Sequence, residues 1–194
     1  KMNKAPRIIV IMIMVLFVSS IFSGCMEDTG PTVEQTVDAL LNTLVLPLSH
    51  FDGDYNITDE EQGTEGHPNE YGFWVLENYS VTYEASSLVQ ISQGLGRFNS
   101  SDDANAAMEE AISRAGAEPS IEEVDAENIG DASWVGRRTT TAEGTEITIY
   151  YVYFQVPDVI AYLVMTDSTL LESTVINNAH NFAAHLQSAV LETG

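Results

Sequence analysis

Lysine is missing from almost the whole of this 194-residue chain, and cysteine occurs only once. Lys1, Lys4 and Arg7 lie within the first 24 residues, which contain no acidic residue. Residues 25–194 contain four arginines and all 29 aspartates and glutamates, and therefore carry a net charge of −25. Contacts with phosphate need a basic surface, so this charge balance excludes nucleic acid as a partner.

The excess of negative charge also indicates the conditions in which the protein works. Its carboxylates repel one another in dilute buffer, and a high salt concentration screens that repulsion. A high net charge keeps the proteins of halophiles soluble. We therefore expect the source to be a salt-adapted microbe, an archaeon. The alternative is a merely acidic surface protein from another organism.

The single cysteine, Cys25, excludes a disulfide within the chain. Glu27 and Asp28 follow it, and these acidic residues oppose formation of the thiolate that a nucleophile needs. Residues 8–22 form an almost unbroken apolar run after a short basic start, which is the pattern of a secretory signal peptide. The run is shorter than the roughly 20 apolar residues of a typical membrane-spanning helix.

The stretch Phe22-Ser23-Gly24-Cys25 resembles the lipobox of prokaryotic lipoproteins, in which small residues precede a cysteine. The resemblance implies that Cys25 becomes the mature N-terminus and is the site of lipid attachment, through a thioether bond to a diacylglyceryl group. It also implies a location on the outer face of the cytoplasmic membrane, at the cell surface, with the membrane as a partner through the lipid anchor.

This interpretation divides the chain into three parts. Residues 1–24 are expected to be a lipoprotein signal peptide, residues 25–31 a polar tether, and residues 32–194 a single domain. The alternative is that the apolar run is not removed and remains as a helical membrane anchor.

Hydrophobic periodicity predicts a domain with helices at both ends and in the middle. A capping-box spacing at Thr32–Gln35 and regularly spaced apolar residues predict a first helix that ends near Val45, before Pro47. β-Branched and aromatic residues predict the strands, of which the hairpin 146–154 and 159–166 is apolar on both faces and therefore central. The remaining predicted elements are a short strand at 55–58, strands at 73–84, 87–98, 120–125 and 132–140, and helices at 100–116 and 172–191.

This order of elements predicts an α+β fold, an antiparallel sheet packed by helices. Residues 35–192 resemble surface lipoproteins with a PsbP-like α/β/α sandwich. The resemblance is carried by the turn Ile129–Ala132, the hairpin Val152–Ile160 and the final helix. It implies no common catalytic residues, and it allows a role as an accessory subunit of a membrane complex.

One acidic stretch invites a calcium interpretation, because oxygen-bearing side chains alternate along it. An EF-hand would need Gly at the sixth position and Glu at the twelfth, where this chain has Ile57 and Gly63. A solvated acidic loop is the simpler interpretation, and we expect no metal and no cofactor. The weak candidate ligands are Asp52, Asp54, Asn56 and Thr58.

Two further sets of residues are candidates for contacts or modification. Arg137 and Arg138 form the one local positive spot, and as neighbours on a strand they point to opposite faces. Each is either a structural ion-pair partner or a contact for an anion. Glycosylation sequons begin at Asn56, Asn78 and Asn99, and of these Asn99 is expected to be the most accessible.

No catalytic constellation is visible in the sequence. It has no Gly-x-Ser-x-Gly elbow, and the lysine of a phosphate-binding loop is missing. His180 and His185 are about 140° apart around the last helix and cannot share a metal ion as an i, i+4 pair would. We therefore expect a non-enzymatic module that binds a small molecule or an envelope protein. The alternatives are an accessory subunit of a membrane complex and a hydrolase whose site is not recognised.

Overall fold

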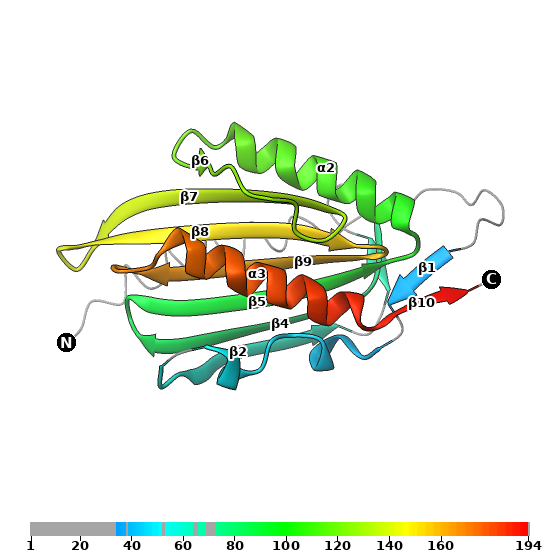
Figure 1. Ribbon diagram of the computed structural model, residues 1–194, viewed down its shortest axis with the longest axis horizontal. Helices are drawn as coiled ribbons and strands as arrows, with labels where there is room; N and C mark the ends of the chain where they lie inside the picture. Colours follow the sequence, from blue (N-terminus) through cyan, green and yellow to red (C-terminus); the bar gives the residue numbers. More distant parts are fainter. Residues whose placement is uncertain (1–33, 38, 52, 64–65, 69–72, 194) are drawn as a thin grey trace.

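The computed structural model describes residues 34–37, 39–51, 53–63, 66–68 and 73–193 (Figure 1). The predicted signal peptide, Cys25 and the tether lie outside these residues. The described chain forms an antiparallel sheet packed by helices, so the predicted α+β class is confirmed. None of the helices in this part of the chain is long and apolar enough to cross a membrane.

The main sheet is antiparallel in every strand pair. Its spatial order is β2 (Asn56–Gly63), β4 (Trp74–Ser86), β5 (Val89–Phe98), β9 (Val159–Asp167), β8 (Thr145–Val156), β7 (Ala132–Ala142) and β6 (Glu122–Glu123), and β3 (His67–Pro68) also pairs with β4. The β8–β9 hairpin is central, as its apolar sequence predicts, and residues 149–166 are buried without interruption. Such runs are typical of strands that are covered on both faces.

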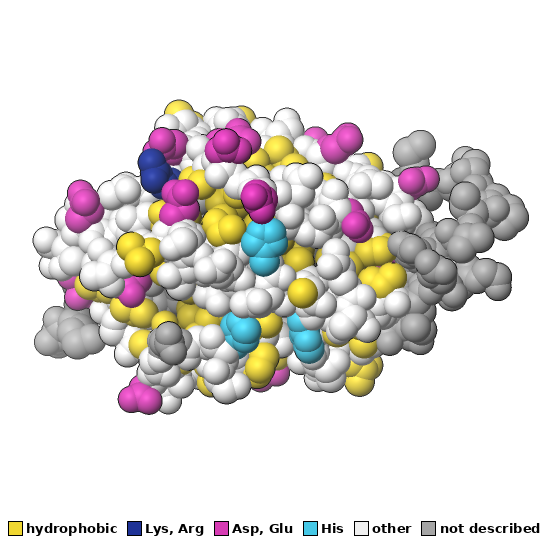
Figure 2. Space-filling model, in the orientation of Figure 1, with side chains coloured by type: hydrophobic (Ala, Val, Ile, Leu, Met, Phe, Trp, Pro, Cys, Tyr) yellow, Lys and Arg dark blue, Asp and Glu magenta, His cyan; other side chains and the backbone are white. Residues whose placement is uncertain are grey.

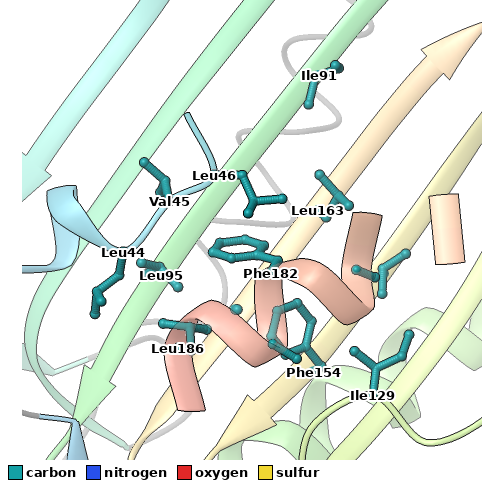
Figure 3. Packing of buried hydrophobic residues seen from close by; sticks show 14 of the residues in the cluster. Leu44, Val45, Leu46, Ile91, Leu95, Ile129, Phe154, Leu163, Phe182 and Leu186 are labelled. Carbon is teal, nitrogen blue, oxygen red and sulfur yellow. The ribbon is translucent and has the colours of Figure 1, made fainter. Parts of the chain in front are cut away.

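Each face of the sheet has its own helix. Alternate residues of β8 point to opposite faces: Tyr151 and Tyr153 pack with α2 (Ser101–Ala117), whereas Val152 and Phe154 pack with α3 (Glu172–Gln187). On the α3 face, the rings of Phe154 and Phe182 meet edge to face, with their centroids 5.3 Å apart (Figure 3). Such aromatic pairs add to the stability gained from burial alone.

Helix α2 forms where the sequence predicts a helix at 100–116, and a serine caps its start. The backbone N–H of Asp103 donates to the side chain of Ser100, 3.1 Å away, which caps the helix. Asp102 and Asp103 lie in the first turn, where the helix dipole favours negative charge. The helix buries one stripe of small and apolar residues against the sheet, made of Ala104, Ala107, Met108, Ala111 and Ala115.

The prediction of a helix from residue 32 to Val45 is wrong. Residues Glu34–Val37 form the strand β1, which pairs with β10 (Val190–Thr193), and residues 39–51 contain only the short 3-10 helices η1 (Leu41–Thr43) and η2 (Leu48–His50). We call residues 39–51 the strap. Five of its apolar residues are buried on the sheet beside α3 without forming an α-helix, because sheet side chains hydrogen-bond the backbone of the strap (Figure 3): Leu41, Leu44, Val45, Leu46 and Phe51.

The β1–β10 pair lies at one end of the long axis of the molecule (Figure 1). The β4–β5 turn, the β7–β8 turn and the link from β9 to α3 lie at the other end. Glu34 and Thr193, the first and last described residues, therefore lie side by side in the β1–β10 pair. The start of β10 also explains why α3 ends at Gln187, before the predicted residue 191.

Candidate functional site

The strap is fixed to the sheet face by side chains rather than by a strand ladder. The Gln93 side chain on β5 is fully buried and forms two hydrogen bonds with the backbone of Leu46. Arg97, also on β5, donates to the backbone carbonyl of Ala39 and pairs with Glu77 at 3.0 Å. Because these contacts satisfy polar groups of an irregular segment, the strap can lie on the sheet without costly unpaired groups.

Helix α3 holds the other side of the strap. The Nε2 atom of His185 lies 3.2 Å from the carbonyl oxygen of Thr43, and Nε2 of His50 lies 3.1 Å from Nδ2 of Asn181. The strap and α3 therefore form one continuous surface, which we call the α3–strap face. In Figure 2, histidine side chains (cyan) lie over α3 and the strap beside it.

The α3–strap face is almost free of charge. Residues 39–51 and 173–191 contain no Asp, Glu, Lys or Arg, although residues 25–194 carry a net charge of −25. None of the exposed residues of α3 is an Asp, Glu, Lys or Arg: they are Ser173, Thr174, Asn177, Asn181, Ala184, His185 and Gln187. Sequence reasoning missed this surface, although the two acid-free stretches were a signal for it, because their proximity depends on how the strap folds.

Arg137 is surrounded by carboxylates. Its guanidinium lies 3.0 Å from Glu122 on β6 and 3.5 Å from Glu172 at the start of α3. Glu122 and Tyr150 raise the pKa of Arg137 above its ordinary value, with the hydrogen bond to Glu122 as the largest cause. In this arrangement Arg137 links β6 to α3 across the strand β7.

Arg138 points to the other face of the sheet, as its neighbouring position requires. It hydrogen-bonds Tyr151, which packs on the α2 face. Burial raises the pKa of the Tyr151 phenol, and Arg138 opposes that shift. The structure therefore separates the two arginines and does not combine them into one anion site.

The candidate calcium ligands do not form a closed loop in the described chain. Asp52 lies outside the described residues, and Asp54 is exposed. Asn56 and Thr58 belong to the extended strand β2, where the Thr58 hydroxyl donates to the Thr82 carbonyl at 3.4 Å. An extended strand spreads its side chains along the sheet edge. Among the described residues, no three His, Cys, Asp or Glu side chains are grouped to hold a metal ion.

The three sequons differ in their surroundings. Asn56 begins the edge strand β2 and is exposed, and Asn99 is exposed in the bend before α2. Asn78 is half-buried within β4, and its side chain lies against Gly63 of β2. The two are so close that a Cβ added to Gly63 would be 2.2 Å from Oδ1 of Asn78. Asn99 and Asn56 can therefore carry a bulky group more easily than Asn78.

No family model matches the chain, and no curated protein matches it. Among solved structures, the chain is similar to the extracellular domain of PknH from Mycobacterium tuberculosis. The identity is 10% and the TM-score is 0.49, over 76% of this chain and 93% of that chain.

Proposed function

We propose that this chain is a lipid-anchored, non-enzymatic module of the cell surface that binds a protein of the cell envelope. The observation that carries the binding role is the uncharged α3–strap face in an otherwise strongly acidic domain. Protein interfaces are depleted of charged residues at their centre. The amide, hydroxyl and imidazole groups of this face can exchange hydrogen bonds with a protein surface.

The lipid anchor is supported by the sequence from the basic start to Cys25. The position of β1 is compatible with it, because the chain enters the described domain at the end where β1 pairs with β10. A domain tethered through Cys25 is then held at that end. The turns at the opposite end extend away from the membrane, and the α3–strap face lies along the side of the domain.

Intact mass spectrometry of the native protein from membranes tests the anchor. We expect the mass of a chain that begins at Cys25, increased by a diacylglyceryl group. The variant Cys25→Ser is the control, and it should keep the full-length mass. A native protein with the mass of the unprocessed chain contradicts the proposed anchor.

Site-specific photo-crosslinking in intact cells tests the binding role. A photoreactive residue at Gln187, on the α3–strap face, should form adducts with a cell-envelope protein. The matched control is the same residue at Asn105, which is exposed on α2. Equal adduct yields at the two positions would remove the reason to assign binding to the α3–strap face.

A further inference from the structure

The two helices of this domain differ in the charge that they expose. Exposed or half-buried positions of α2 include Asp102, Asp103, Glu109, Glu110 and Arg114, as expected for the surface of an acidic protein. The corresponding positions of α3 contain one carboxylate, Glu172, and it pairs with Arg137. The same chain thus builds one helix with a charged outer face and one with an uncharged outer face.

We propose that the protein bound at the α3–strap face is a second copy of this chain, an inference that rests on the binding role proposed above for this face. Two copies of residues 25–194, each with a net charge of −25, repel each other wherever their carboxylates approach. The α3–strap face allows two identical surfaces to meet without placing carboxylates opposite one another. A symmetric dimer uses the same patch on both subunits, so this patch must be able to contact an identical patch without repulsion between like charges.

The residues of the face also suit close packing of two helices. Five exposed residues recur at intervals of three or four along α3 and its C-cap, and they cover a single stripe because about 3.6 residues make one turn: Ser173, Asn177, Asn181, Ala184 and the C-cap residue Ser188. Their small side chains permit an interhelical distance at the short end of the usual range of about 8–10 Å. The strap adds apolar surface, because Leu40 is 65% exposed.

The direction of α3 sets how the two copies pair. Its C-terminal end lies toward the β1–β10 pair, where the chain enters the domain (Figure 1). Two copies anchored in one membrane must both turn this end toward it, so their α3 helices run parallel about a two-fold axis along the membrane normal. This orientation rests on the proposed lipid anchor, whereas pairing through the α3–strap face does not.

Disulfide cross-linking in the full-length chain tests both parts. Parallel helices place each residue opposite its own copy, so Asn177→Cys and Ala184→Cys should each give cross-linked dimers on oxidation. The matched controls on α2 are Asn105→Cys and Ala106→Cys, which replace the same residue types at exposed positions. They should give no more dimer than the parent chain, whose Cys25 sets the background.

The pattern of cross-links distinguishes the orientations. Residues 177 and 184 lie about 10 Å apart along the helix, and a disulfide needs Cα atoms about 4.4–6.8 Å apart. In an antiparallel pair at most one position can face its own copy, so a dimer at only one position, or only in the double variant Asn177→Cys/Ala184→Cys, overturns the parallel arrangement. If neither single variant nor the double variant forms cross-linked dimers, the proposed pairing through the α3–strap face is wrong.

Introduced charge gives an independent test that does not depend on cysteine. The variant Asn177→Glu/Ala184→Glu should raise the dimer dissociation constant of the full-length chain at least tenfold in analytical ultracentrifugation with detergent. The control Asn105→Glu/Ala106→Glu on α2 should leave it unchanged. A parent chain that is monomeric, or two variants with equal effects, overturns the proposal. If the native chain forms this dimer but its mass shows no lipid, only the proposed anchor and the orientation derived from it are contradicted.

Discussion

The side chain of Gln93 forms the two hydrogen bonds with the backbone of Leu46 that a neighbouring β-strand would otherwise form. The Nε2 atom of Gln93 donates to the carbonyl oxygen of Leu46 at 3.0 Å, and Oε1 accepts from the backbone N–H of the same residue at 2.9 Å. One fully buried side chain therefore satisfies both backbone groups of a residue that lies 47 positions away in an irregular segment. Without this pairing, the Leu46 N–H would lose its acceptor, and the Leu46 carbonyl would keep only the longer hydrogen bond from the Tyr83 hydroxyl, at 3.5 Å.

The variant Gln93→Leu should destabilise the domain by about 1–3 kcal/mol, the cost of one unpaired buried polar group, because the Leu46 N–H loses its acceptor while the Leu46 carbonyl keeps the Tyr83 hydroxyl. Denaturant unfolding of the full-length chain in high salt measures this change in free energy. Gln62→Leu, at an exposed position of β2, should change the stability by less than about 0.5 kcal/mol. Equal losses for the two variants would show that the pairing with Leu46 contributes little.

This contact also marks where sequence reasoning succeeds and where it fails. The strands of the central hairpin were predictable because Ile147–Phe154 carries its own apolar, β-branched and aromatic signal. The strap was not, because Leu41, Leu44 and Val45 have the spacing of a helix, while their conformation is set by Gln93 and other partners distant in sequence. Local pattern is overridden here by tertiary contacts.

The candidate site shows the same division. The two acid-free stretches at 39–51 and 173–191 can be read from the printed sequence. The sequence does not show that these stretches lie side by side in one face, because that arrangement depends on contacts between distant residues, such as the hydrogen bond between His185 and Thr43. An ion-pair role for Arg137 is one of the two alternatives that the sequence leaves open. Its partners Glu122 and Glu172 belong to two different elements, so the sequence alone does not identify them.

Gly94 provides a test of packing on the α2 face of the sheet. The ring of Tyr162 lies directly over it, so that an added Cβ would be 2.0 Å from Cε1 of the ring. Gly94→Ala must displace this buried ring, and the expected loss is about 1–3 kcal/mol, typical of an overpacked core. Thermal unfolding measures it, and the added substitution Tyr162→Leu should recover part of the loss by making room.

Gly116 is the matched glycine for this test. It lies within α2, and nothing is within 4 Å of a Cβ added there. Gly116→Ala should therefore stabilise the domain, by up to about 1 kcal/mol, because alanine favours a helix more than glycine does. If both alanine variants shift the unfolding temperature in the same direction, the close approach of Tyr162 does not explain the effect at Gly94.

The charge of the domain predicts a strong dependence of stability on salt. The Debye length falls from about 10 Å at 0.1 M to about 3 Å at 1 M, which screens repulsion among the carboxylates of residues 25–194. The unfolding temperature should rise steeply over this range in both sodium chloride and potassium chloride. A rise that occurs only with sulfate would instead indicate the effect of excluded salts on burial of apolar surface.

The raised pKa of Tyr79 predicts that the domain loses stability at alkaline pH. Its hydroxyl donates to Glu60 at 2.9 Å, and burial, followed by this hydrogen bond and the charge of Glu60, raises the Tyr79 pKa to about 12. The native state thus favours the neutral phenol, so this contribution to stability is complete below pH 10 and is lost as the pH rises from 10 through about 12. Unfolding free energies measured across this range should fall less in Tyr79→Phe than in the parent chain.

The carboxylate of Glu60 provides the control for that titration. Glu60→Gln removes the charge and should move the Tyr79 pKa back toward its ordinary value, while burial keeps it raised because burial is the larger cause. Glu61→Gln removes a neighbouring carboxylate that does not accept this hydrogen bond, and it should leave the Tyr79 titration unchanged. Phenolate absorbance followed in the folded protein distinguishes the two variants. An identical titration in both would mean that the hydrogen bond between Tyr79 and Glu60 does not hold the proton on the phenol.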